Sequence, residues 1–170
     1  CGERGLTRLL YAWFLYPGNK RMKGSDRMTR LQKKTVVLLA RVAGTARLFD
    51  RLGGAEALHA LDRCLKRISR GVEGFRGRVV RTTRDEIVAR FSAVDDACLA
   101  AIAIQTRIAD LPPISGMQLA VRIAFAEGNA DDHASDLVTD GWSATERLLD
   151  QAQPGQILIS GETRALLSPP

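Results

Sequence analysis

The sequence predicts an α+β fold with a ferredoxin-like core, in which helices flank a mostly antiparallel central sheet. Three observations lead to this expectation. The length of 170 residues suits one domain with a tail. A content of 45% hydrophobic and 26% charged residues is typical of a globular protein. Short β-branched runs alternate with helical periodicity in the order β-α-α-β-β-α-β-α-β-α. We expect the helices to cover one face of the sheet.

The first strand and the first two helices follow from residues 35–73. Residues 35–42 are a short β-branched apolar run, which predicts a buried strand interrupted by Arg41. Residues 44–52 predict a helix that is closed by two glycines. Residues 55–73 place leucine and isoleucine at spacings of three and four, which predicts an amphipathic helix.

A hairpin and a further helix follow. Residues 78–82 and 86–91 are short apolar runs around a polar turn, so we expect a β-hairpin. Residues 97–111 predict a helix whose acidic start suits the positive end of the helix dipole. A Pro-Pro pair ends this helix, because proline cannot continue it.

The remaining elements lie between residue 117 and the C-terminus. Residues 117–125 alternate apolar and polar side chains, which predicts a long strand. A loop rich in glycine, asparagine and aspartate follows at 128–136. The sequence then predicts a helix over 140–152, a short strand over 156–160 and a last helix over 161–167.

Positive charge is concentrated before the predicted domain. Residues 1–34 contain nine Lys or Arg and two Asp or Glu, whereas residues 35–170 contain sixteen Lys or Arg and seventeen Asp or Glu. A nearly neutral folded part argues against a globular domain that binds a specific nucleic acid. We therefore divide the chain into a basic juxtamembrane or linker segment with a short apolar helix, residues 1–34, and a domain, residues 35–170.

The apolar patch at residues 9–16 is far shorter than the roughly 20 residues that span a bilayer. It fits the cytoplasmic end of a transmembrane helix, an interfacial helix, or an arm that packs on the domain. The basic residues that follow are typical of a cytoplasmic flank. We expect a domain tethered to the cytoplasmic face of a membrane.

Cysteine and histidine usage excludes several kinds of site. The three cysteines, Cys1, Cys64 and Cys98, are odd in number and contain no C-x-x-C pair, which excludes a disulfide scaffold and a cysteine-based zinc site. The two histidines, His59 and His133, are too few and too far apart for a histidine-rich metal centre. A reducing, cytoplasmic setting is therefore favoured.

One segment near the C-terminus resembles a known family. Arg147, followed at 152–160 by the run AQPGQILIS, closely resembles the end of the catalytic domain of class III adenylyl and guanylyl cyclases. The resemblance extends over roughly residues 35–168. Gly44 resembles the turn after the family's first strand, and Asp85 lies at the hairpin tip that carries its second metal-binding Asp. The resemblance implies the nucleotide cyclase fold.

The chemistry of that family needs more than the fold. Two carboxylates hold two Mg²⁺ ions, which activate the ribose 3′-hydroxyl and bind the triphosphate. An Asn positions the ribose and an Arg stabilises the developing phosphate charge. Because the last two come from the partner subunit, the resemblance implies a site that is assembled only in a head-to-tail dimer.

The metal positions implied by the resemblance depart from the family. Arg41 stands where the first metal-binding Asp belongs, and its positive charge opposes Mg²⁺. Asp85 remains at the second position, between Arg84 and Glu86. We expect Asp85 to be either a residual metal ligand or the salt-bridge partner of Arg41. No cofactor is expected, with Mg²⁺ needed only if activity is retained.

The base-selecting positions are occupied by charged residues. The resemblance places Arg81 and Asp136 where adenylyl cyclases carry Lys and Asp or Thr. This pair could still read adenine, although Arg is not equivalent to Lys as a donor. ATP is therefore a possible ligand.

Of the two positions that act in the family's transition state, one keeps the family's residue. Ser143 stands at the Asn position, where its side chain is too short for the same hydrogen bond. Arg147 keeps the position of the Arg. Arg147 could equally be an exposed helical residue that pairs with Glu146 or Asp150.

We expect a degenerate, non-catalytic cyclase-like domain that serves as a regulatory, dimerisation or ligand-sensing module in signal transduction, as a homodimer or heterodimer. The alternative is an adenylyl cyclase subunit that is active only with a partner supplying both metal-binding Asp residues. A further alternative is binding of nucleic acid or anionic lipid by residues 1–34 alone.

Overall fold

A computed structural model describes residues 34–129 and 140–169. Five strands form one sheet in the order β2-β3-β1-β4-β5. Neighbouring strands are antiparallel except for β4 and β5, which confirms the mostly antiparallel sheet. The strands are β1 (Lys34–Ala43), β2 (Arg78–Thr82), β3 (Glu86–Phe91), β4 (Ala120–Asn129) and β5 (Ile157–Ile159).

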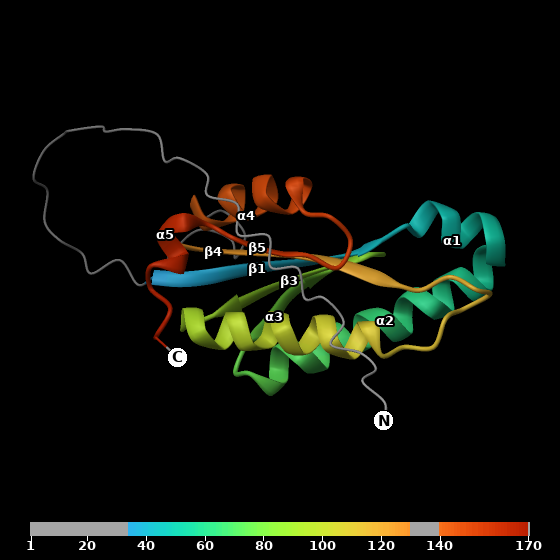
Figure 1. The fold of residues 1–170 in the computed structure, drawn as a ribbon, viewed down its shortest axis with the longest axis horizontal. Helices are drawn as coiled ribbons and strands as arrows, with labels where there is room; N and C mark the ends of the chain where they lie inside the picture. Colours follow the sequence, from blue (N-terminus) through green and yellow to red (C-terminus); the bar gives the residue numbers. More distant parts are fainter. Residues whose placement is uncertain (1–33, 130–139, 170) are drawn as a thin grey trace, which may run out of the picture.

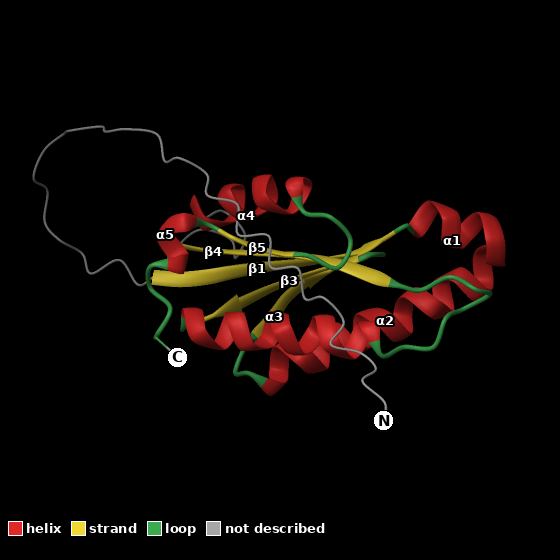
Figure 2. Cartoon of the chain, in the orientation of Figure 1, coloured by secondary structure: helices red, strands yellow, loops and turns green. Residues whose placement is uncertain are grey.

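Helices cover both faces of this sheet (Figures 1 and 2). Helices α2 and α3 lie side by side under one face, whereas α4 lies on the opposite face. The expectation that the helices cover one face is therefore wrong, although their order along the chain is confirmed. The helices are α1 (Thr45–Leu52), α2 (Gly54–Gly74), α3 (Val94–Ala109), α4 (Asp140–Gln151) and α5 (Gly161–Arg164).

The two-sided cover follows from the composition of β1. Leu38 and Ala40 belong to the core beneath α2 and α3, whereas Val37 and Leu39 belong to a second core with Leu149 of α4. A strand that is apolar on both faces must be covered on both faces. The sheet therefore requires α4 on the side away from α2 and α3.

Several predicted boundaries are displaced. Ile114 and Met117 exchange backbone hydrogen bonds of 2.9 Å in both directions across a tight turn, so the residues before Ala120 do not extend the strand. Strand β4 then continues to Asn129, because it pairs with β1 over the whole of β1. The last helix ends at Arg164, three residues earlier than expected. Strand β1 is not interrupted at Arg41 and runs on to Ala43.

Glycines allow the helices to approach their neighbours closely. A Cβ atom at Gly71 of α2 would overlap the side chain of Ile104 in α3. A Cβ at Gly141, in the first turn of α4, would lie 3.1 Å from the backbone nitrogen of Gly128 in β4. The glycine at position 141 thus lets α4 begin directly against the sheet.

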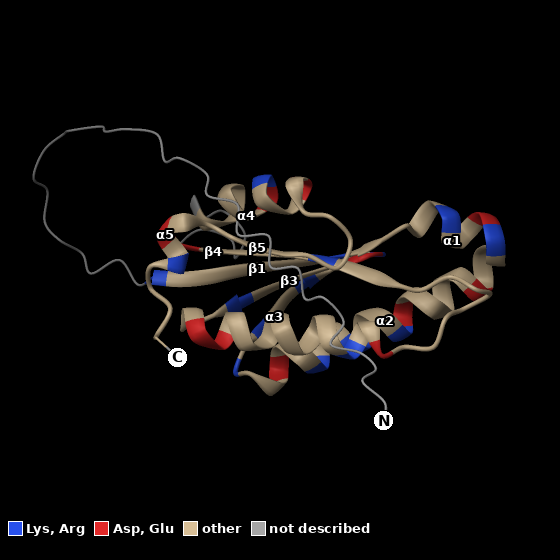
Figure 3. Cartoon of the chain, viewed as in Figure 1, with Lys and Arg blue, Asp and Glu red and all other residues tan. Residues whose placement is uncertain are grey.

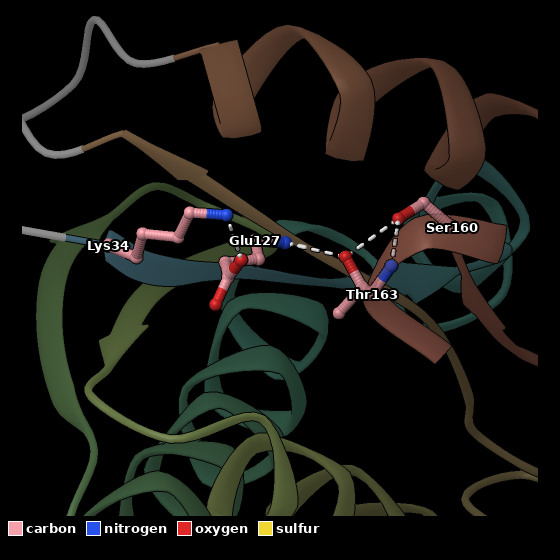
Figure 4. Close-up of polar contacts among 4 residues, drawn as sticks. All are labelled: Lys34, Glu127, Ser160 and Thr163. Atoms are coloured by element: carbon pink, nitrogen blue, oxygen red, sulfur yellow. Dashed lines mark hydrogen bonds and ion pairs between the residues drawn. The ribbon is translucent and has the colours of Figure 1, made fainter. Parts of the chain in front are cut away.

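The first residue of β1 is joined to α5 through β4 (Figure 4). Lys34 Nζ lies 3.0 Å from Glu127 Oε2, and the backbone nitrogen of Glu127 donates to Thr163 Oγ1 at 2.8 Å. Ser160 caps α5 by accepting from the backbone nitrogen of Thr163, and its hydroxyl donates to Thr163 Oγ1. Three elements therefore meet where the domain begins.

Some sequence predictions lie outside the described residues: the apolar patch at 9–16, most of the basic segment, and the 130–136 part of the loop with Asp136 and His133. Among the residues that are described, no helix combines the length and the apolar character needed to cross a membrane.

Candidate functional site

The candidate site lies near the end of β1, on the face that α4 covers. Arg41 follows Val37 and Leu39 in the alternation of β1, so its side chain is on the side of the second core. The strand register places Arg41 opposite Glu86 of β3 on one side and opposite Arg122 of β4 on the other. Figure 3 shows basic and acidic positions adjoining in these central strands.

Arg41 and Glu86 form the shortest ion pair of the site. Arg41 Nη2 and Nε lie 2.6 and 2.8 Å from the same oxygen, Glu86 Oε2. The Glu86 side chain is only 8% exposed. From α4, Asp150 Oδ1 lies 3.5 Å from Arg41 Nη1. The Arg41 guanidinium thus connects three elements of the fold.

These carboxylates stabilise the charged form of Arg41. Partial burial acts to lower the pKa of Arg41, but the hydrogen bond and charge of Glu86 act in the opposite direction. Asp150 and Asp85 add to that attraction, and the pKa of Arg41 is raised above its ordinary value. Arg41 is therefore a permanent cation in this site.

Arg81 of β2 also faces Glu86. An irregularity between Val79 and Arg81 shifts the register so that Arg81 lies opposite Val88, which belongs to the second core. Arg81 Nη2 is 3.5 Å from Glu86 Oε1, and its guanidinium carbon lies 4.8 Å from the ring centroid of Trp142 in α4. This cation–π contact and the buried carboxylate both hold Arg81 within its own chain.

We call Arg41, Arg81 and Arg122 the arginine cluster. The Nε atoms of Arg81 and Arg122 are buried and have no hydrogen-bond partner among the described residues. Arg122 lies directly across the strand pair from Arg41, and like charges in such positions repel each other. Glu86 and Asp150 are the acids that pair with Arg41 and so offset its charge.

Asp85 does not pair with Arg41 in the way expected. The ion-pair partners of Arg41 are Glu86 and Asp150, and Asp85 contributes only a longer-range attraction. The hairpin forms as predicted: β2 pairs antiparallel with β3, and the backbone nitrogen of Thr83 donates to the backbone oxygen of Glu86 at 2.9 Å. Neither Asp85 nor the preceding Arg84 has a positive φ, so this turn does not depend on glycine.

The residues present do not suit a pair of divalent cations. Within the described ranges, no group of three or more His, Cys, Asp or Glu side chains is placed to hold a metal ion. A guanidinium lies between Glu86 and Asp150, where it already neutralises the carboxylates. Replacing it with Mg²⁺ would require Arg41 to move away from a buried acid.

The two predicted transition-state positions are both carried by α4. Ser143 and Arg147 are both exposed on α4. Asp150, which the sequence offered as a partner for Arg147, pairs with Arg41. Arg147 makes no ion pair with another described residue, so the exposed placement is confirmed and the pairing with Asp150 is wrong.

The sequence interpretation missed the roles of three residues: Glu86, Trp142 and Asp150. Glu86 carried a usable signal, because an acid at the start of a buried strand needs a basic partner. The antiparallel pairing of β1 with β3 supplies that partner at Arg41. The contacts of α4 had no comparable signal, since they depend on which face that helix covers.

Comparison with known proteins identifies the fold. No family model matches the chain, and no curated protein does. Among solved structures, a monomeric guanylyl cyclase domain of the RhoGC fusion protein from Blastocladiella emersonii is similar at 18% identity and a TM-score of 0.69. The alignment covers 79% of this chain and 85% of that domain.

Two bacterial proteins are also similar. An adenylate/guanylate cyclase/hydrolase from Silicibacter pomeroyi shares 26% identity at a TM-score of 0.64, over 81% of this chain and 83% of its own. The adenylyl cyclase CyaB from P. aeruginosa shares 19% identity at a TM-score of 0.64, over 79% of this chain and 80% of its own. The chain therefore has the fold of the catalytic domain of class III adenylyl and guanylyl cyclases.

Proposed function

We propose that this chain is a non-catalytic domain with the cyclase fold, which acts as a regulatory and dimerisation module in signal transduction. The observation that carries the proposal is the pairing of Arg41 with the buried Glu86 at the position that the family resemblance assigns to the first metal-binding Asp.

Electrostatics supports the absence of two-metal chemistry. A guanidinium about 4 Å from a Mg²⁺ ion raises the energy by about 8 kcal/mol at an effective dielectric of about 20. Two-metal catalysis needs carboxylates at this point to hold the ions that activate the hydroxyl and bind the triphosphate. Arg41 supplies the opposite charge, and its guanidinium already pairs with the nearest carboxylates, Glu86 and Asp150.

The nucleotide-reading positions support the same conclusion. Arg81 is engaged by Glu86 and Trp142, so adenine would have to displace contacts within the chain. Ser143 is too short to replace the Asn that positions the ribose in the family. Asp136, the other base-selecting position, lies outside the described residues.

Dimerisation is supported by the relatives of the fold. The guanylyl cyclase domain of the RhoGC fusion protein from Blastocladiella emersonii is described as monomeric in one structure and as a non-canonical dimer in another, so this fold is compatible with a dimer. We propose that this chain forms a homodimer or a heterodimer with another cyclase-like domain. The basic residues 1–34 attach it to the cytoplasmic face of a membrane through anionic headgroups.

A second candidate function is an adenylyl cyclase subunit that works only in a heterodimer. Arg147 favours it, because this side chain is exposed on α4 and available to a partner domain. The partner would have to supply both metal-binding carboxylates. Product formed after mixing with such a partner, and lost with Arg147→Ala, would select this function.

The proposal is tested by calorimetric titration of the full chain with ATP and with GTP, each with and without Mg²⁺ or Mn²⁺. We expect no metal-dependent binding of either nucleotide. Metal-dependent binding of ATP at micromolar concentration would contradict the non-catalytic assignment. Weak binding of ATP that is the same with and without metal would be consistent with a non-catalytic domain that senses a ligand.

A further inference from the structure

We infer that Arg41 is an internal cation whose guanidinium holds carboxylates from β3 and α4 together, so that the domain folds around this site without any divalent metal ion. The inference rests on the proposed function, since it concerns the same site. It goes beyond lost catalysis, because it assigns the substituted residue a positive structural role.

The first step concerns Glu86. Its side chain is almost fully buried, and a buried carboxylate is costly unless it is paired and hydrogen-bonded. Arg41 Nε donates to Glu86 Oε2 and Nη2 lies 2.6 Å from the same oxygen, while Arg81 faces Oε1 at 3.5 Å. Both oxygens of Glu86 are thus opposed by positive charge from neighbouring strands.

The second step concerns α4. Asp150 is carried by this helix, and its contact at 3.5 Å reaches the same guanidinium from the other side. Arg41 therefore contacts acids from two elements while belonging to a third. A metal ion bound by carboxylates of separate elements would connect them in a similar way.

The third step is the balance of charge. Arg41 is opposed by Glu86, Asp150 and, at longer range, Asp85; Arg81 also faces Glu86, and Arg122 lies opposite Arg41, so these six side chains carry three positive and three negative charges. A neutral site does not attract a divalent cation. Loss of the Arg41 charge leaves one excess negative charge, and Arg41→Asp leaves two, which is the condition under which a divalent cation would be attracted.

The test compares the Tm of the full chain in EDTA, in Mg²⁺ and in Mn²⁺, for the wild type, Arg41→Met and Arg41→Asp. We expect the wild-type Tm to be the same in all three. Arg41→Met should lower the Tm by about 5 °C or more, because Glu86 loses its closest partner. The Tm of Arg41→Asp in EDTA should be lower still, and Mn²⁺ should raise it.

Hydrogen exchange supplies the readout for α4. Amides in the last turn of α4, around Asp150, should exchange modestly faster in Arg41→Met than in the wild type, because the 3.5 Å contact of this 73% exposed side chain with the partly buried Arg41 is removed. Lys66→Met is the matched control, since it breaks an exposed ion pair with Asp62 within α2 and should change neither Tm nor exchange in α4.

Either of two results would overturn the inference: a wild-type Tm that rises with Mn²⁺, or an Arg41→Met variant as stable as the wild type. If Arg41→Asp does not fold, the wild type and Arg41→Met still test the inference. Equal stability of Arg41→Met would leave the non-catalytic assignment intact. Metal-dependent nucleotide binding without a metal effect on Tm would overturn that assignment alone.

Discussion

Glu86 Oε2 accepts a hydrogen bond of 2.8 Å from Arg41 Nε and lies 2.6 Å from Arg41 Nη2, across the antiparallel pair of β3 and β1. The two residues are direct partners in the strand register, so the backbone fixes the approach of their side chains. The sequence resemblance to class III cyclases places the family's first metal-binding acid at this end of the first strand. Here this end of the strand presents a base to an acid of the same chain.

Removing the acid from this pair should be strongly destabilising. Glu86→Gln leaves Arg41 and Arg81 facing one another without a carboxylate between them, and we expect a loss of about 2–4 kcal/mol in the free energy of unfolding. Urea denaturation measures this. Glu73→Gln, at an exposed position of α2, is the control and should change stability by about 0.5 kcal/mol or less. Equal effects of the two substitutions would contradict the assigned role of Glu86.

The contacts at the start of the domain should differ in strength. Lys34→Met removes an ion pair whose lysine is 64% exposed, so we expect a loss of about 0.5 kcal/mol or less. Thr163→Val removes the acceptor of the Glu127 backbone N–H and disturbs the cap of α5, which should cost about 1–3 kcal/mol. Denaturation of both variants checks the order. A larger loss for Lys34→Met would show that the exposed pair, and not the buried hydroxyl, joins β4 to its neighbours.

Close packing of α2 against α3 predicts opposite outcomes for two glycines. Gly71→Ala places a Cβ atom into the side chain of Ile104 and should lower stability by about 1–3 kcal/mol, although alanine favours helices. Gly74→Ala meets nothing within 4 Å and should be neutral or mildly stabilising. Thermal unfolding of the two variants provides the comparison. A neutral Gly71→Ala would mean that the two helices lie further apart than described.

Cys64 should make stability depend on pH in the alkaline range. Burial raises the pKa of this thiol from 9.0 in the unfolded chain to about 11 in the folded domain. Because the folded pKa is the higher one, its contribution is complete below pH 9 and is lost as the pH rises toward 11. The wild type should lose up to about 1.4 kcal/mol per pH unit in this range relative to Cys64→Ala. Parallel pH profiles of the two proteins would contradict the burial of this thiol.

The order of elements could be predicted because each depends on a local pattern. The spacing of leucines in α2 and the polar turn between β2 and β3 lie within short windows of sequence. The position of α4 is less local, although the continuous apolar run of β1 already indicated burial on both faces. The start of β4 was missed because Ser115 and Gly116, both with positive φ, turn the chain before the strand begins.

The candidate site was predicted in part. Sequence reasoning singled out Arg41, Arg81 and Asp85, and the fold brings them to the same end of the sheet. It did not assign Glu86 to Arg41, because the pairing depends on the register between two strands that are 45 residues apart at this point. Nor could it assign Asp150 to Arg41, since that contact requires α4 to cover this face.

The most direct test of the non-catalytic assignment is to incubate the full chain with ATP or GTP and Mn²⁺ and to measure the 3′,5′-cyclic nucleotide formed, beside Arg147→Ala. The account predicts no product above a protein-free blank for either protein, because we propose that Arg41, paired with Glu86, stands where a metal-binding acid would be needed. Sustained, metal-dependent formation of cyclic AMP or cyclic GMP by the wild type, lost in Arg147→Ala, would contradict it.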